Sequence, residues 1–222
     1  MQDYSRFFSE LYIARWPLIE GVGVTLIISA IAIVLGTLLG IGVGLALVYG
    51  GKVQRLLVRG LLEYIRGTPV FVLILACYYL LSQIGIQLTA FQAGLVALTV
   101  FCSSHVGENL RGALLALPKG QTEAAKAIGL TFPQTFVYVL APQALRQALP
   151  AWINTAAEMV KASTLLSVIG VLELMLATRQ VIARDSSLNL EFYLVAGVVY
   201  FLICFSIERL GRHVERRVSL PS

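Results

Sequence analysis

The chain has 222 residues, of which 58% are hydrophobic and only 13% are charged, and its mean hydropathy is +0.82. A soluble domain carries about a quarter charged residues, so this chain lacks the polar side chains that a water-exposed surface requires. Lipid is therefore the expected solvent for most of it. The three cysteines lie far apart inside apolar stretches, a pattern that forms neither a disulfide framework nor a metal site.

The first long apolar run predicts a membrane-spanning helix over about 22–48, because about 20 apolar residues suffice to cross a bilayer. Gly36, Gly40 and Gly44 recur every four residues in this run, which places them on one helix face. The stripe has two interpretations. It allows a neighbouring helix to approach closely, or it reflects the general frequency of glycine in membrane helices.

Four more spans are expected further along the chain. The uncharged run 67–107 is too long for one helix and too short for three, and a polar break at 82–89 divides it into two. With two later apolar runs, the expected spans after the first are 69–82, 91–112, 150–176 and 192–208. Because the runs are continuous and show no strand-type alternation, the sequence predicts an all-α membrane protein rather than a barrel. We expect a single transmembrane domain over 1–222 with five transmembrane helices.

Lysine and arginine are distributed unevenly among the expected loops. The segments 52–66, 111–146 and 209–217 hold twelve of the 17 basic residues. Cytoplasmic loops are enriched in these residues, so we expect the N-terminus to be periplasmic and the C-terminus cytoplasmic. This bias also accounts for the net charge of +5 without a nucleic-acid partner.

The expected cytoplasmic loop, about 117–146, carries clear local signals. Residues 122–128 are strong helix formers, and Gly129 sits where a left-handed C-terminal cap is expected. Thr131 is a suitable N-cap for a second short helix, with Gln134 placed as in a capping box. A helix–Gly–helix elbow of this kind predicts a docking element. The alternative is an ordinary amphipathic loop that packs on the cytoplasmic face of its own bundle.

This loop resembles the EAA signature of the permease subunits of bacterial polar amino acid ABC importers, of the histidine, glutamine and arginine permease kind. The residues that match the signature are Glu123, Ala124, Ala125 and Gly129, followed by Ala141-Pro142-Gln143-Ala144-Leu145-Arg146 near the usual LPQALR. Other stretches similar to the family, in the family's order, are Gly23-Val24-Thr25-Leu26, Arg66-Gly67-Thr68-Pro69 and Ser167-Val168-Ile169-Gly170-Val171-Leu172-Glu173-Leu174. The resemblance covers residues from about 20 to 180.

The resemblance implies a type I ABC importer permease fold and a division of labour between subunits. The EAA loop would be the coupling helix that docks into a separate ATPase, whose closure drives a rocking of the membrane helices. The chain itself has no G-x-x-x-x-G-K-[ST] phosphate loop. We therefore expect no catalytic residue, metal or cofactor in this chain, with ATP and Mg on the partner ATPase.

The partners implied by the resemblance are an ABC ATPase dimer, a second permease subunit that is a copy or a paralogue, a periplasmic or extracytoplasmic binding protein, and membrane lipid. No nucleic acid is expected. The implied location is the bacterial inner membrane, which the chain would cross several times.

Glu158 and Lys161 lie inside an expected span, where charged residues are costly and usually mark a pathway or site. They are three residues apart and share a helix face with Asn154 one turn earlier. An amino acid carries a carboxylate and an ammonium, and a neighbouring acid–base pair can complement both. Alternatively, the two charges only neutralise each other or stabilise a seam of the bundle.

The resemblance extends this candidate site, because the corresponding helix of the family contributes to substrate binding. The family's usual pattern resembles Asn-Glu followed by Lys-Asp-Thr-Ser or Lys-Ser-Thr. Here Thr155 and Ala162 replace the two acids, which argues against an arginine- or lysine-type cargo and leaves open that the partner permease binds the cargo. The substrate-binding candidates are Gly67, Thr68, Asn154, Thr155, Glu158, Lys161, Ser163 and Thr164.

Glu108 and Arg111, near the cytoplasmic end of the third expected span, match a Glu and an Arg of the family's AEIxRG pattern. We predict that they form a gate or a structural pair. His105 stands where the family commonly has tyrosine and is interpreted as a structural residue able to tune cargo or pH response.

Two other classes of function compete with a translocating permease. A self-sufficient secondary carrier or channel would use Glu108, Glu158 and Lys161 as ion-coupling groups and would need no ATPase. An intramembrane enzyme is disfavoured because the two histidines are far apart in the sequence and no nucleophile or metal constellation is present. The EAA match favours a non-catalytic permease that translocates a polar amino acid or a related compound.

Overall fold

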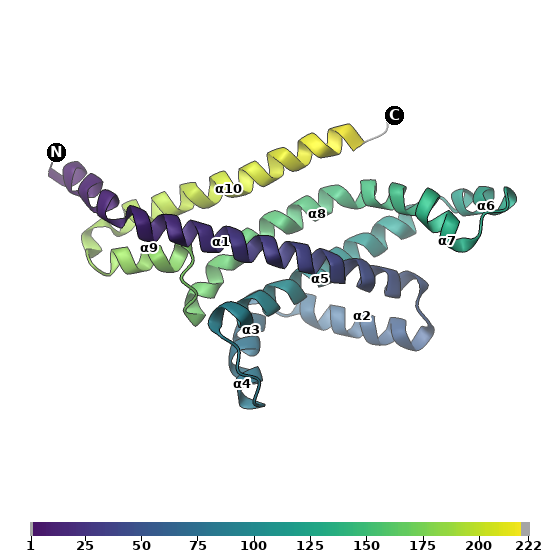
Figure 1. Cartoon of the computed structure of the whole chain (residues 1–222), viewed down its shortest axis with the longest axis horizontal. Helices are drawn as coiled ribbons and strands as arrows, with labels where there is room; N and C mark the ends of the chain where they lie inside the picture. Colours follow the sequence, from purple (N-terminus) through teal and green to yellow (C-terminus); the bar gives the residue numbers. More distant parts are fainter. Residues whose placement is uncertain (1, 219–222) are drawn as a thin grey trace. The chain divides into compact units, whose positions relative to one another are not determined.

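The computed structural model describes residues 2–218, which form helices joined by short connections (Figure 1). The helices are α1 (Gln2–Tyr49), α2 (Lys52–Gly67), α3 (Val70–Leu75), α4 (Leu81–Gln83), α5 (Ala90–Ala116), α6 (Lys119–Ala127), α7 (Phe132–Thr135), α8 (Ala141–Ser163), α9 (Leu174–Ile182) and α10 (Asn189–Val218). A π-helical stretch over residues 76–80 joins α3 to α4, and another over residues 136–140 joins α7 to α8. The all-α class expected from the sequence is confirmed.

The chain folds into two compact units, each with its own core. Unit 1 combines Met1–Ile33, Pro69–Thr99 and Ala157–Ser206, and unit 2 combines Val34–Thr68, Val100–Ala156 and Ile207–Ser222. The long helices α1, α5, α8 and α10 each contribute one part to unit 1 and the other part to unit 2.

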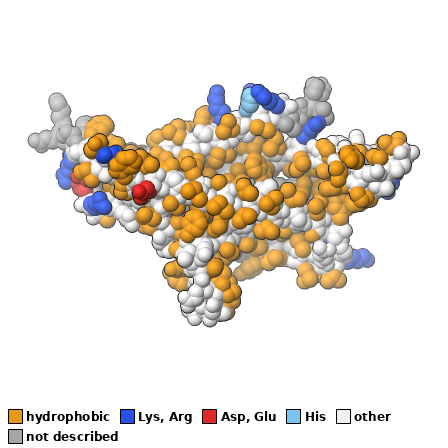
Figure 2. All heavy atoms as spheres, in the orientation of Figure 1, with side chains coloured by type: hydrophobic (Ala, Val, Ile, Leu, Met, Phe, Trp, Pro, Cys, Tyr) orange, Lys and Arg blue, Asp and Glu red, His pale blue; other side chains and the backbone are white. Residues whose placement is uncertain are grey.

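Within residues 2–218, three helical segments are long and apolar enough to cross a membrane: Arg6–Tyr49, Ala90–Ala116 and Ser186–Arg217. Two broken helix pairs raise the number to five if each pair is counted as one span: Lys52–Gly67 with Val70–Gln83, and Phe132–Ile169 with Leu174–Ile182. Apolar side chains cover most of the face seen in Figure 2, as a surface in contact with lipid requires.

Helix α1 begins at Gln2, whereas the sequence analysis places its start near residue 22. Ala14 and Leu18 are buried in unit 1 against side chains of α9 and α10, so core packing stabilises the additional turns. Charged residues interrupt the apolar run in this region, which is why hydropathy alone starts the span later. They are Arg6, Glu10, Arg15 and Glu20.

The segment expected as one helix over 150–176 is interrupted in unit 1. Helix α8 ends at Ser163 and is followed by a 3₁₀ turn over Thr164–Ile169. Gly170 then adopts a φ of +88°, a left-handed conformation that glycine tolerates and other residues rarely adopt. Helix α9 continues after a bend of 50°. The apolar run hides this break because the side chains on both sides of it remain hydrophobic.

Glu173 begins α9 and is fully buried in unit 1. Its carboxylate accepts hydrogen bonds of 2.9 Å from each of the backbone amides of Met175 and Leu176. The hydroxyl of Tyr200, on α10, donates to the same carboxylate. A buried carboxylate is stable only when its oxygens are hydrogen-bonded, so this set of donors explains its position and joins α9 to α10.

Replacing Glu173 with alanine should destabilise the protein, because the substitution leaves buried donors without an acceptor. Loss of a cap and of buried hydrogen bonds costs about 1–3 kcal/mol. The measurement is the Tm of the purified protein in mild detergent, with Glu20→Ala as the control because Glu20 is exposed on α1. Equal Tm values for the two variants would contradict the structural role of Glu173.

In unit 2, glycines of α1 allow a close contact with α5. A Cβ atom at Gly40 would lie 2.7 Å from the Cβ of Val106, and one at Gly44 would lie 2.9 Å from the carbonyl oxygen of Gly107. From the other side, a Cβ at Gly107 would lie 2.6 Å from Cγ1 of Val43. Real Cβ contacts are not this short, so the interpretation of the glycine stripe as a close helix contact is confirmed for Gly40 and Gly44.

A Gly40→Val substitution should prevent this contact and sharply reduce the yield of monodisperse protein. Helices in lipid associate through packing rather than through the hydrophobic effect, so little else compensates for the clash. Gly42→Val is the matched control, because a Cβ at Gly42 meets nothing within 4 Å. The measurement is fluorescence-detected size-exclusion chromatography of both variants, and similar profiles would argue against the contact.

Candidate functional site

One face of α8 carries polar side chains that point away from the protein interior. Asn154, Glu158 and Lys161 are exposed, whereas the intervening Ala157 and Met159 are buried. Asn154 belongs to unit 2, whereas Glu158 and Lys161 belong to unit 1. Within unit 1, the spacing of three residues places Glu158 and Lys161 on one side of α8. Among the residues that the structure describes, none forms an ion pair with Glu158 or Lys161. The structure therefore does not support mutual neutralisation of these two charges.

Three other candidate residues of this region are engaged in local hydrogen bonds. Thr155 is buried in unit 2, where its hydroxyl accepts from the Asn109 amide at 3.3 Å and donates to the carbonyl of Ala151 at 3.0 Å. In unit 1, the buried Ser163 hydroxyl donates to the carbonyl of Val160 at 2.8 Å. The Thr164 hydroxyl donates to the carbonyl of Lys161 at 2.7 Å. The bonds to carbonyls three and four residues earlier are the ordinary helical contacts of hydroxyl side chains, whereas the bond from Asn109 joins α5 to α8 within unit 2.

Gly67 and Thr68 lie at the end of α2 in unit 2. The Thr68 hydroxyl donates to the carbonyl of Tyr64 at 2.7 Å and so helps to end the helix. Within unit 2, the described hydrogen bonds do not join Gly67 or Thr68 to Asn154 or Thr155.

Glu108 and Arg111 form a two-bond ion pair on α5. The Arg111 Nε lies 2.9 Å from Glu108 Oε2, and its Nη2 lies 2.6 Å from Oε1. Arg66, on α2, adds a third charge with Nη1 at 3.8 Å from the same Oε2. A cavity of about 270 Å³ adjoins the three residues and is also lined by Arg59 and Glu63. This network ties α2 to α5 within unit 2.

The loop after α5 has the conformation that its sequence predicts. Helix α6 is followed by Gly129 in the left-handed conformation, with a φ of +82°. The side chain of Gln134 then accepts a 2.9 Å hydrogen bond from the amide of Thr131, which forms part of the capping box of α7. The predicted helix–Gly–helix elbow is confirmed.

The elbow exposes most of its side chains. Glu123 and Ala124 are exposed, and Ala125 is buried. Two large apolar side chains at the bend, Ile128 and Phe132, are 77% and 56% exposed. The Phe132 ring lies edge-to-face on Tyr49 of α1, with centroids 5.1 Å apart, so the elbow packs partly on its own unit. Ile128 and the outer side of Phe132 stay exposed, and exposed apolar side chains of this size are available to another molecule.

The family model described as "Binding-protein-dependent transport system inner membrane component" matches residues 32–220. The chain belongs to this family. It is therefore a non-catalytic membrane component of a transport system, as the resemblance of its elbow implies.

Individual relatives match this permease over almost their whole length. It is 33% identical over 213 residues to the glutamine transport system permease protein GlnP of Escherichia coli (strain K12), covering 93% of this chain and 97% of GlnP. It is 30% identical over 203 residues to the arginine transport system permease protein ArtQ of Bacillus subtilis (strain 168), covering 90% of this chain and 92% of ArtQ.

Solved structures match as well. The permease is similar to a chain in the crystal structure of an amino acid ABC transporter with histidines, with a TM-score of 0.85, 32% identity, and coverage of 93% of this chain and 97% of that chain. A chain of an inward-facing MetNI methionine ABC transporter shares the fold, with a TM-score of 0.81 at 24% identity and coverage of 92% of this chain and 97% of that chain.

The sequence did not predict two features of the permease. One is the contact of Arg66 with Glu108, although the basic and acidic residues of α2 recur at helical spacing: Arg59, Glu63 and Arg66. The other is the exposure of Ile128 and Phe132 at the elbow. Apolar residues next to a predicted docking element were the available signal, but only the packing shows which of them stay exposed.

Proposed function

We propose that the chain is the permease subunit of an ATP-driven importer that carries a polar amino acid or a related compound across the bacterial inner membrane. The relatives named for glutamine and arginine transport, and the amino acid ABC transporter of known structure, support this class of cargo. Thr155 and Ala162, in place of acidic residues, favour a cargo without a cationic side chain.

The membrane arrangement in this proposal has five crossings. In the two broken helix pairs, which bend by 106° and 50°, the segments 52–66 and 132–146 stay on the cytoplasmic side and the apolar remainder of each pair crosses the membrane. The positive-inside rule places the N-terminus in the periplasm and the C-terminus in the cytoplasm. The elbow then lies on the cytoplasmic side with Lys119, Lys126 and Arg146. A single permease domain would thus extend over residues 1–222.

The exposed elbow is the observation that carries the proposal. Its conformation is fixed by Gly129 and by the cap of α7, so it can transmit a displacement as a rigid body. Glu123, Ile128 and Phe132 are exposed on it and offer one charged and two apolar contacts. We assign this surface to a separate ABC ATPase dimer, which would bind ATP and Mg. The remaining partners are a second permease subunit and an extracytoplasmic binding protein.

An Ile128→Asp substitution should weaken the ATPase interaction by tenfold or more, because a central apolar contact of an interface contributes about 2 kcal/mol. The measurement is the amount of ATPase that co-purifies with the tagged permease, together with ATP-dependent uptake. Val53→Asp is the control, because Val53 is 72% exposed on α2 and lies outside the elbow. The assignment would be refuted by an Ile128→Asp variant that retains the ATPase and wild-type uptake.

The polar face of α8 is assigned to the cargo path. A charged side chain at the centre of a membrane helix costs about 2.5–3.5 kcal/mol when it meets lipid. Glu158 and Lys161 are exposed without an ion-pair partner in the described chain, so their face requires water or another polar surface. We infer that this face lines the passage, where Glu158 attracts the ammonium and Lys161 the carboxylate of the cargo. Asn154, in unit 2, is a separate candidate that offers an uncharged donor and acceptor.

The other candidates have supporting positions in this assignment. Thr155 links α8 to Asn109 of α5, and the hydroxyls of Ser163 and Thr164 are satisfied by carbonyls of the preceding turn, while Gly67 and Thr68 shape the end of α2. Glu108 and Arg111 form a structural pair or gate that links α5 to α2 through Arg66.

Glu158→Gln and Lys161→Gln should each raise the KM for uptake by roughly ten- to a hundredfold. Each substitution removes a charge-assisted hydrogen bond to the cargo, and such a bond contributes about 1.5–3 kcal/mol to binding. The measurement is uptake of a panel of labelled amino acids into proteoliposomes that contain the whole importer. Glu20→Gln and Arg179→Gln are matched controls, because both residues are exposed and lie outside α8. Wild-type kinetics and selectivity in both α8 variants would exclude this face as the cargo site.

A further inference from the structure

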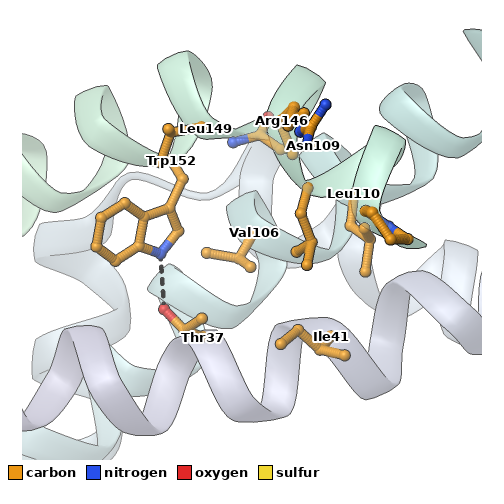
Figure 3. A pocket seen from close by; sticks show the side chains of 11 residues that line it. Thr37, Ile41, Val106, Asn109, Leu110, Arg146, Leu149 and Trp152 are labelled. Atoms are coloured by element: carbon orange, nitrogen blue, oxygen red, sulfur yellow. Dashed lines mark hydrogen bonds between the residues drawn. The ribbon is translucent and has the colours of Figure 1, made fainter. Parts of the chain in front are cut away.

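A cavity of about 500 Å³ lies within unit 2, between α1, α5 and α8 (Figure 3). Its walls are formed mainly by aliphatic side chains such as Ile41 of α1, Val106 of α5 and Leu149 of α8. The indole Nε1 of Trp152 donates a 2.8 Å hydrogen bond to the hydroxyl of Thr37 at one side of the cavity. This bond holds α8 against α1 and satisfies the polar atom of the tryptophan.

The cavity is separate from the polar face of α8. An α-helix turns about 100° per residue, so Trp152 points roughly 200° away from Asn154. Leu145 and Leu149 are three to seven residues before Trp152 and lie on its side of the helix. Within unit 2 the cavity therefore lies on the side of α8 opposite to Asn154, and it does not depend on the cargo assignment.

One positive charge lies at the edge of this apolar space. Arg146 lines the cavity, is exposed, and forms no ion pair with the described residues. The other polar side chains of the lining are already engaged: Asn109 donates to Thr155, and Trp152 donates to Thr37. No acidic side chain lines the cavity among the described residues. The combination of an apolar space and a single guanidinium fits an amphiphile with an apolar tail and an anionic head.

We propose that this cavity binds one acyl chain of an anionic phospholipid, whose phosphate lies on Arg146. The α1 and α5 walls belong to the candidate spans Arg6–Tyr49 and Ala90–Ala116, so the cavity lies at the depth of the acyl chains. A space of this size is typical of sites for small ligands, which occupy about 300–1,000 Å³. A helix of a partner subunit is about 10–12 Å across and would need a longer groove. Arginine can reach the phosphate layer while its aliphatic stem stays against the apolar wall.

Native mass spectrometry of the delipidated, detergent-purified importer tests the proposal. Phosphatidylglycerol and phosphatidylcholine with the same acyl chains are added, and the bound lipids are counted. The wild type should retain phosphatidylglycerol in preference to phosphatidylcholine. Leu149→Trp, which fills the cavity, should reduce phosphatidylglycerol binding at least tenfold, whereas Arg146→Gln should remove only the preference. Lys52→Gln is the control, because Lys52 is an exposed cation of α2 outside the cavity.

Equal lipid binding by the wild type and Leu149→Trp, or an unchanged preference in Arg146→Gln, would overturn the proposal. If Leu149→Trp fails to fold, a photoreactive benzoylphenylalanine in place of Leu145 tests the occupant directly in native membranes. Crosslinks to phospholipid support the proposal, whereas a crosslink to a second permease subunit, or no lipid adduct, would contradict it.

Discussion

Backbone contact between α1 and α5 is the interaction on which unit 2 depends. Membrane helices gain little from the hydrophobic effect when they associate, since lipid is as apolar as their side chains. Gly40, Gly44 and Gly107 remove the side chains that would separate the two backbones. The close contact places two lining residues of the proposed lipid cavity, Ile41 and Val106, next to α8. It also fixes the part of α5 from which Glu108 reaches Arg66 of α2.

The buried carboxylate of Glu173 and the exposed carboxylate of Glu158 differ in whether the fold itself supplies their partners. Glu173 has a complete set of donors from the start of α9 and from Tyr200, so its burial is explained by the fold of unit 1. Glu158 lies in an equally apolar sequence but is exposed and has no ion-pair partner in the described chain. A carboxylate that the fold does not satisfy requires water or another polar group beside it, and in the proposed function a zwitterionic cargo is a partner of suitable charge.

The sequence predicted those features that depend on local chemistry. The family followed from ordered motifs, and the elbow followed from Gly129 and Thr131, whose conformations are set by their immediate neighbours. Features that depend on tertiary packing could not be predicted from local chemistry. The break after Ser163 is hidden by continuous hydrophobicity, and the early start of α1 depends on burial of Ala14 and Leu18. The cavity beside Trp152 has no sequence signature, because three separate helices form it.

The central claim is that the elbow couples this permease to a separate ATPase. The most direct measurement is purification of the tagged chain from its native membrane in mild detergent, followed by identification of co-purifying proteins by mass spectrometry. The account predicts a stoichiometric ABC ATPase subunit that is released when the surface formed by Glu123, Ile128 and Phe132 is altered. An intact, folded chain that brings down no ATPase, and whose transport follows an ion gradient alone, would contradict it.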